Sequence, residues 1–204
     1  MKLSFCRNVE AVLAPFLVLC ACVLGLHHVE ATPDILDPLD SSFCHGDLQV
    51  IYPQLEVDKC LIVGKSLREK LTVDWGAPEI HFPGAQKGKK YVMVMADPDA
   101  PRRVKQTTGY WRHWLVVDIQ GGALKDGRLV GRTLTDYHPP SPPSKTGFHR
   151  YQFMLFEQPP GAQVSLTEKE NASRGKWDLS AFTKKFGLEA KVATLQFLTK
   201  NYKD

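Results

Sequence analysis

The sequence predicts a single mostly β domain with a helix near its C-terminus. Several apolar runs of five to seven residues are rich in Val, Tyr and Phe and end at Gly or Pro, as is typical of strands buried on both faces. Helical spacing of apolar residues is credible only near the C-terminal end. The composition, 43% hydrophobic and 24% charged over 204 residues, excludes a collagen-like or wholly disordered chain.

Five strands are expected along the chain. The first two are short and end at prolines, which cannot continue a strand interior. The other three are long, nearly continuous apolar runs, which favours burial on both faces. In order, the five segments are Leu48–Tyr52, Glu79–Phe82, Tyr91–Ala96, Trp114–Ile119 and Tyr151–Phe156.

The expected helix begins after Asp178, a residue that can cap its first turn. Three apolar side chains then share one face: Leu179, Phe182 and Phe186. Lys184 and Lys185 fall in the last turn and Gly187 ends the helix, as cations and glycine commonly do at a helix C-terminus. This end of the domain is therefore predicted to be helical and peripheral.

Residues 1–31 are predicted to be a signal peptide, with the cut between residues 25 and 31. Lys2 and Arg7 precede an uncharged run from Ala11 to Leu26, and small residues follow it, which is the usual order in a secretory leader. A buried helix or an uncleaved anchor is the alternative, although the run is short for a membrane span and contains Pro15. Residues 32–204 are then expected to form one domain.

The leader removes three of the five cysteines and leaves Cys44 and Cys60. In an oxidising compartment two cysteines suggest one disulfide, which would close a loop of about 15 residues. Two buried thiols are the alternative, and a zinc site has little support because paired C-x-x-C spacing is absent.

Asn171-Ala172-Ser173 is a glycosylation sequon. It lies in a polar stretch that is expected to be an exposed loop. In a protein that enters the secretory pathway, Asn171 is therefore predicted to carry glycan.

The charge balance is mildly basic, with 26 Lys and Arg against 22 Asp and Glu, or +4. Nucleic-acid binders usually concentrate positive charge on one element, and this sequence has no such block. The excess supports at most a weak, peripheral preference for anionic membrane surfaces.

Polar side chains gather in the loops that border the long apolar runs. Asp97 and Asp99 flank a proline after one run, and His113 stands at the start of the next. A stiff loop with four prolines within residues 139–143 precedes His149 and the third run. If the three strands are neighbours, these groups converge on one opening, which suits a preformed pocket for a small ligand.

Three motifs in order, DPDAP at 97–101, WRHWLVV at 111–117 and PPSKTGFHRY at 142–151, together resemble the phosphatidylethanolamine-binding protein family. The resemblance covers roughly residues 43–202 and, with the leader and the sequon, is nearest to the secreted mammalian type. It implies a large antiparallel sheet packed on a smaller antiparallel sheet, with peripheral helices. It also implies a small anion pocket that accepts phosphate and phosphorylethanolamine headgroups.

Carried over by position, the resemblance implies a set of pocket residues. Asp99 is expected to brace its loop rather than contact ligand. Ser141 stands where the family usually has glycine, which puts a close backbone approach to the anion in doubt. Arg112 replaces a histidine and is expected to add charge near the rim. The residues expected to bind ligand are Asp97, Pro101, His113, Ser141, Pro142, His149 and Tyr151.

The chemistry of these residues fits a zwitterionic headgroup. The histidines and Tyr151 can donate hydrogen bonds to phosphate, and Asp97 can accept one from an ammonium group. The contribution of the histidines should strengthen as pH falls through about 6.5. The expected function is non-enzymatic binding of phosphatidylethanolamine or another phosphate-bearing headgroup, by a monomer that is secreted or resides in the secretory or lysosomal lumen.

Two other functions remain as alternatives. Members of the family modulate Raf/MEK/ERK kinase signalling, serine proteases or floral transcription complexes, so the resemblance implies a signalling-protein partner or a protease as the alternative partner. A metal-dependent hydrolase would need a spacing such as H-E-x-x-H, and a serine hydrolase would need G-x-S-x-G; the sequence has neither. No enzyme activity, cofactor or metal is therefore expected.

Overall fold

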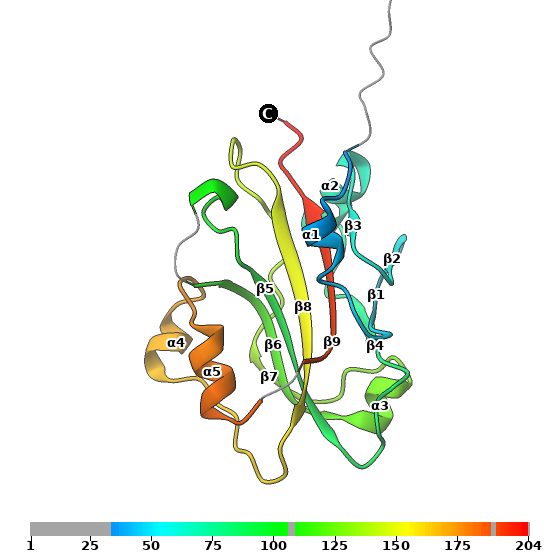
Figure 1. Cartoon of the computed structure of the whole chain (residues 1–204), viewed down its shortest axis with the longest axis vertical. Coiled ribbons are helices and arrows are strands. Elements are labelled where there is room, and N and C mark those ends of the chain that lie inside the picture. The colour runs from blue at the N-terminus through cyan, green and yellow to red at the C-terminus, as the bar shows by residue number, and fades with distance from the viewer. Residues whose placement is uncertain (1–33, 106–108, 189–190, 204) are drawn as a thin grey trace, which may run out of the picture. The chain divides into compact units, whose positions relative to one another are not determined.

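Two β-sheets and several short helices make up the part of the chain that the computed structural model describes, residues 34–105, 109–188 and 191–203 (Figure 1). The signal peptide predicted for residues 1–31 lies outside these ranges. Its cleavage site therefore stays a prediction. Within the described ranges, no helix is both long enough and apolar enough to span a bilayer.

The larger sheet has six strands among the described residues, in the order β3-β9-β8-β5-β6-β7. They are β3 (Leu61–Ile62), β5 (Lys90–Asp97), β6 (Trp111–Gln120), β7 (Arg132–Thr135), β8 (His149–Gln158) and β9 (Lys191–Thr199). Neighbouring strands are antiparallel except β3 and β9, which run parallel. The sheet is thus mixed at one edge, where a fully antiparallel sheet was expected.

The smaller sheet is antiparallel, with the order β2-β1-β4. Its strands are β1 (Gln49–Tyr52), β2 (Leu55–Val57) and β4 (Glu79–His81). The helical segments are α1 (Pro38–Ser41), α2 (Lys65–Val73), α3 (Gly121–Lys125), α4 (Glu168–Ala172), α5 (Leu179–Lys185) and the 3-10 turn η1 (Arg103–Lys105). The fold class predicted from the sequence, a large sheet packed on a smaller one with peripheral helices, is confirmed.

Each face of the larger sheet packs against its own hydrophobic core. Successive side chains of a strand point to opposite faces, and β5 shows this directly. Tyr91, Met93 and Met95 join the core shared with the smaller sheet, whereas Val92, Val94 and Ala96 join the core beneath α5. Figure 1 shows the smaller sheet and the α4–α5 pair on opposite sides of the larger sheet. Burial on both faces explains why the central strands are continuous apolar runs.

The five expected strands correspond to β1, β4, β5, β6 and β8, and the expected helix is α5, capped by the Asp178 side chain. The expectation that helix occurs only near the C-terminus is wrong, because α2 spans nine residues. Leu71 is the residue that α2 buries fully, so little apolar periodicity marks it. β9 was not expected either, because buried polar residues interrupt its apolar pattern. Among them is Gln196, whose side chain forms hydrogen bonds with the Gln152 side chain and the Asp40 carbonyl.

Cys44 and Cys60 form a disulfide, as predicted, across a sequence separation of 16 residues. Cys44 precedes β1, and Cys60 directly precedes β3. The bond therefore ties an edge strand of the larger sheet to the segment that enters the smaller sheet.

Replacing both cysteines with serine should lower the free energy of unfolding by about 3 kcal/mol, because the unfolded chain regains the entropy of a loop of this length. Denaturant unfolding of the double variant, beside the wild type with and without reductant, measures the loss. Reduced wild type should match the variant. Equal stability of the oxidised wild type and the variant would contradict a stabilising role.

Candidate functional site

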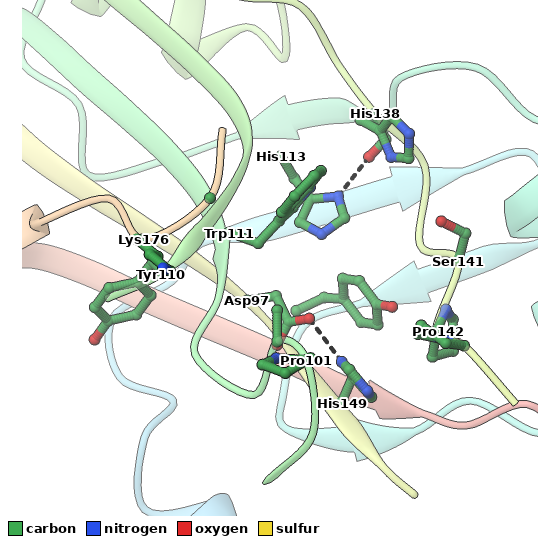
Figure 2. A pocket seen from close by; sticks show the side chains of 14 residues that line it. Asp97, Pro101, Tyr110, Trp111, His113, His138, Ser141, Pro142, His149 and Lys176 are labelled. Atoms are coloured by element: carbon green, nitrogen blue, oxygen red, sulfur yellow. Dashed lines mark hydrogen bonds and ion pairs between the residues drawn. The ribbon is translucent and has the colours of Figure 1, made fainter. Parts of the chain in front are cut away.

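A cavity of about 470 Å³ opens where three strands of the larger sheet end together (Figure 2). β5 pairs with both β6 and β8, so the end of β5 lies beside the beginnings of the other two. The convergence expected from the sequence is present in the structure. The cavity is lined by Asp97, Ala100, Pro101, Tyr110, Trp111, His113, His138, Ser141, Pro142, Pro143, His149, Tyr151, Gly175 and Lys176.

All seven side chains expected to bind ligand are among the residues that line this cavity. Sequence reasoning missed several others, notably Tyr110, His138 and Lys176. Tyr110 could have been noticed from its place beside the WRHWLVV motif, and His138 from its place before the proline loop. Lys176 lies far away in the sequence and carries no local signal.

Asp97 and His149 form a buried pair at the base of the cavity. His149 Nδ1 lies 2.7 Å from Asp97 Oδ2, and both residues are at most 3% exposed. The other carboxylate oxygen of Asp97 accepts the backbone N–H of Asp99 at 2.7 Å. Burial raises the pKa of Asp97, although the hydrogen bond from His149 opposes that shift.

A hydrogen-bond chain fixes how many protons this pair holds. The Thr146 hydroxyl donates to the Pro143 carbonyl at 2.7 Å, and Thr146 Oγ1 lies 2.8 Å from His149 Nε2. Because the hydroxyl proton is committed to the carbonyl, Nε2 must donate to Thr146. A further proton then lies between His149 Nδ1 and Asp97, so the pair carries no net charge.

Asp99 braces the loop and does not line the cavity. Its carboxylate accepts the Arg150 guanidinium at 2.7 and 2.9 Å and the Arg150 backbone N–H at 2.9 Å. The Arg150 guanidinium also lies 3.9 Å from Asp40, which forms two 2.9 Å bonds with Arg103. This network of two carboxylates and two guanidinium groups holds the loop after β5 in place.

His113 is almost fully buried and faces the cavity in one tautomer. Its Nδ1 lies 2.8 Å from the His138 carbonyl, and a carbonyl only accepts, so Nδ1 carries the hydrogen. Nε2 is then an acceptor, and Figure 2 shows it directed toward the space above Asp97. Burial is the main cause that lowers the pKa of His113 from 6.5 to about 4, with Arg174 among the charges that add to it.

For His113, this state differs from the expectation that the ring donates a hydrogen bond to the ligand and titrates near pH 6.5. Both ring nitrogens of His149 already have partners in Asp97 and Thr146. His113 is neutral at physiological pH and presents an acceptor. The sequence could not show this, because the lowered pKa results from burial by distant segments.

Residues 170–177, which we call the strap, form another wall of the cavity. The backbone N–H of Arg112 in β6 donates to the Arg174 carbonyl of the strap, and Tyr110, just before β6, forms a bridge with Trp177. The Arg174 guanidinium donates to the His113 carbonyl at 3.1 Å and the Asp136 carbonyl at 2.8 Å. Figure 2 shows Lys176 beside Tyr110 at this wall.

Arg112 belongs to the underside of the strap rather than to the cavity rim. Its guanidinium donates to Thr135 Oγ1 at 2.6 Å and the Glu170 carbonyl at 2.7 Å, and lies over the Trp177 ring. The side chain is 2% exposed. The expectation that Arg112 adds charge near the rim is wrong, because residues of β6 alternate in direction and His113 occupies the cavity side.

The proline loop closes the remaining side. Tyr151 is buried, and burial raises the pKa of its phenol well above the ordinary value, so the hydroxyl stays protonated. A hydrogen bond from the Ser141 backbone acts in the opposite direction. Ser141 is not among the residues with positive φ, so its conformation does not require the glycine usual in the family. The positive charge of Arg68 in α2 also acts against the rise in the Tyr151 pKa.

The sequon residue Asn171 is exposed, as expected, but it lies in α4 and not in a loop. Thr167 and Glu170 form a capping box at the start of this short helix. Glycosylation of Asn171 stays a prediction. Throughout the described ranges, no cluster of three or more His, Cys, Asp or Glu side chains is arranged to hold a metal ion.

The fold and the cavity together define a two-sheet β domain with a small cavity at the ends of its central strands. Residues 61–201 match the sequence model of the phosphatidylethanolamine-binding proteins, and the chain belongs to that family. The prediction of the family is thereby confirmed.

Solved structures agree on the fold. A carboxypeptidase Y inhibitor, crystallised with its cognate proteinase, is 21% identical with a TM-score of 0.59, over 76% of this chain and 82% of that one. The phosphatidylethanolamine-binding proteins of Plasmodium vivax and Plasmodium falciparum are each 18% identical, with TM-scores of 0.56 and 0.53. These two similarities cover 76% and 75% of this chain and 84% of each relative.

The lowered pKa of His113 should make the protein less stable in acid. Between pH 6.5 and about 4 the unfolded chain binds a proton at this histidine that the folded chain does not, so the free energy of unfolding falls as pH falls. From pH 7 to pH 4 the loss should be about 3 kcal/mol. Denaturant titrations of wild type and His113→Gln measure it as the pH-dependent difference between the two proteins.

The raised pKa of Asp97 makes the free energy of unfolding rise as pH falls, which is opposite to the effect of His113. Asp97 is present in both wild type and His113→Gln, so its effect largely cancels in the difference between them. His45→Asn is a matched control, because His45 is exposed. It should keep the wild-type profile. Parallel profiles for wild type and His113→Gln would contradict the buried neutral state of His113.

Removing the Thr146 hydroxyl should change the protonation of His149. In Thr146→Val the Nε2–H of His149 loses its acceptor, which favours a singly protonated ring beside a charged Asp97. Nitrogen NMR of the imidazole should show a hydrogen on Nε2 in wild type and none on Nε2 in the variant. Thr146→Ser should retain the Nε2 hydrogen. An Nε2 hydrogen in Thr146→Val would contradict this role of Thr146.

Proposed function

We propose that this protein binds phosphate and phosphorylethanolamine headgroups, without catalysing a reaction, in the cavity at the ends of β5, β6 and β8. One observation carries the proposal: the base of the cavity has no net charge, whereas permanent cations surround it. The Asp97–His149 pair shares a proton, and His113 is neutral. Lys176 lines the wall, and Arg174 lies behind His113.

This charge distribution supports an anion in a space too small for acyl chains. Charges in a concave, partly desolvated site interact more strongly than charges in water. Tyr151 supplies a hydroxyl donor, and Arg68 contributes charge from behind it. A volume of about 470 Å³ is suited to a headgroup.

The aromatic side chains at the wall support recognition of the amine. Tyr110 and Trp111 line the cavity, and Trp111 is 37% exposed. An ammonium group over such a ring gains a cation–π attraction. The phosphate would then lie toward His113, and the amine would lie toward Trp111.

The proposal places the protein outside the cytosol, in secretions or in the secretory or lysosomal lumen, as a monomeric glycoprotein of the secreted mammalian type of the family. The apolar leader and the Asn171 sequon support this location, and the Cys44–Cys60 disulfide agrees with an oxidising compartment. Contact with membranes would be peripheral.

The alternative functions are those of relatives that act on other proteins. The carboxypeptidase Y inhibitor shares the fold at 21% identity, which makes protease inhibition a second hypothesis. Modulation of a kinase pathway would require this chain to reach a cytosolic partner. Mass spectrometry of what co-purifies from mammalian secretions distinguishes a headgroup ligand from a stable protein partner.

Calorimetry with phosphorylethanolamine tests the proposed binding. Affinity should be tighter at pH 5.5 than at pH 8 by roughly tenfold or more, because a phosphate monoester with a second pKa near 6 gains a proton over this range and can donate it to His113. His113→Gln should weaken binding at pH 5.5 by roughly tenfold, and His45→Asn should leave it unchanged.

Two outcomes would contradict the proposal. Absence of binding at both pH values would reject headgroup binding in this cavity. Equal loss of affinity in His45→Asn and His113→Gln would show that the ligand binds elsewhere or that the loss reflects general damage.

A further inference from the structure

The polar atoms at the base of the cavity have a fixed donor and acceptor pattern. Asp97 uses one oxygen for the Asp99 N–H and the other for His149, whose second nitrogen bonds Thr146. These atoms already have partners within the protein. His113 Nε2 can accept a hydrogen bond from a ligand, and the Tyr151 hydroxyl, which accepts one from the Ser141 backbone, still has its hydrogen to donate.

A ligand that matches this pattern must donate a hydrogen bond to His113 and accept one from Tyr151. A singly protonated phosphate monoester does so, because its P–OH group donates and its other oxygens accept. A phosphate diester has lost its one acidic proton across the physiological pH range, so its free oxygens only accept. Beside His113 Nε2, a diester oxygen would place two acceptors in contact.

We propose that the cavity selects singly protonated phosphate monoesters over phosphate diesters, because His113 faces the ligand as a hydrogen-bond acceptor. The proposal rests on the proposed headgroup binding and narrows it. Free phosphorylethanolamine and inorganic phosphate have the required chemistry. An intact phosphatidylethanolamine molecule is a diester and lacks it.

A diester can bind only if His113 first takes up a proton, and burial of the ring is the main obstacle to that. The rings of His138 and Tyr151 pack against His113 with ring centroids at 5.7 and 5.2 Å. The hydrogen bond from Nδ1 to the His138 carbonyl of the loop after β7 acts in the opposite direction, because it favours the protonated ring. Arg174 of the strap, His138 and His149 of β8 each disfavour a positive charge on His113. Lys176 of the strap adds a further cation to the lining.

The size of the preference follows from the two proton affinities. With the pKa of His113 at about 4, the need to protonate this ring before a diester can bind reduces diester affinity about a thousandfold at pH 7 and about tenfold at pH 5. A monoester with a pKa near 6 loses about tenfold at pH 7 and almost nothing at pH 5. The monoester preference should therefore be about a hundredfold at pH 7 and about tenfold at pH 5.

The test compares phosphorylethanolamine with glycerophosphorylethanolamine, which has the same amine on a diester. Calorimetry of the full mature chain at pH 5 and pH 7, each in two buffers of different ionisation enthalpy, gives affinity and proton uptake. We expect the monoester to bind about a hundredfold more tightly than the diester at pH 7. At pH 5 the diester should bind with uptake of nearly one proton and the monoester with almost none.

Inorganic phosphate forms a third arm, and its binding would show that the amine is not required for selection. His113→Gln should bring the two affinities together, because an amide can donate as well as accept. His45→Asn should keep the wild-type ratio. The comparison of ligands on wild type does not depend on how well either variant folds.

Equal affinity of the two ligands at pH 7, equal proton uptake at pH 5, or tighter diester binding would overturn monoester selection and leave headgroup binding intact. Failure of phosphorylethanolamine, glycerophosphorylethanolamine and inorganic phosphate to bind at either pH would instead reject the proposed function itself.

Discussion

The pairing of β5 with both β6 and β8 positions every polar group at the base of the cavity. These strands are buried on both faces. A shift of register by one residue would therefore move each side chain to the opposite face of the sheet, out of one core and into the other. Two cores therefore fix the register, and the register fixes the strand ends. Asp97, His113 and His149 meet because each stands at the same edge of this three-strand unit.

Burial at that edge changes the chemistry of the residues it collects. A carboxylate without a partner would be costly to desolvate. Asp97 is stabilised by the proton that it shares with His149 and not by a permanent cation. Thr146 makes that arrangement possible because it accepts the second N–H of His149. The site thus keeps acidic and basic side chains together with no net charge at its base, which leaves the surrounding cations unopposed.

Much of this architecture could be predicted from the sequence, because strand periodicity and turn residues are local properties. The central strands, α5 and the seven residues expected to bind ligand are examples. What could not be predicted depends on contacts between distant segments. β9 contains polar residues whose partners, such as Gln152 for Gln196, are 44 positions away. Lys176 reaches the cavity because the strap is bonded to β6, and no motif marks it.

The hydrogen-bonding role of His113 is the clearest example of a property that the sequence could not predict. A histidine between two tryptophans in the WRHW motif suggests a donor that titrates near its ordinary pKa. In the fold, the His138 carbonyl takes the Nδ1 hydrogen and burial beside Arg174 holds the ring neutral. The same residue therefore becomes an acceptor. Its identity places it in the pocket, but the backbone of a loop 25 residues away determines which ligand atoms it can meet.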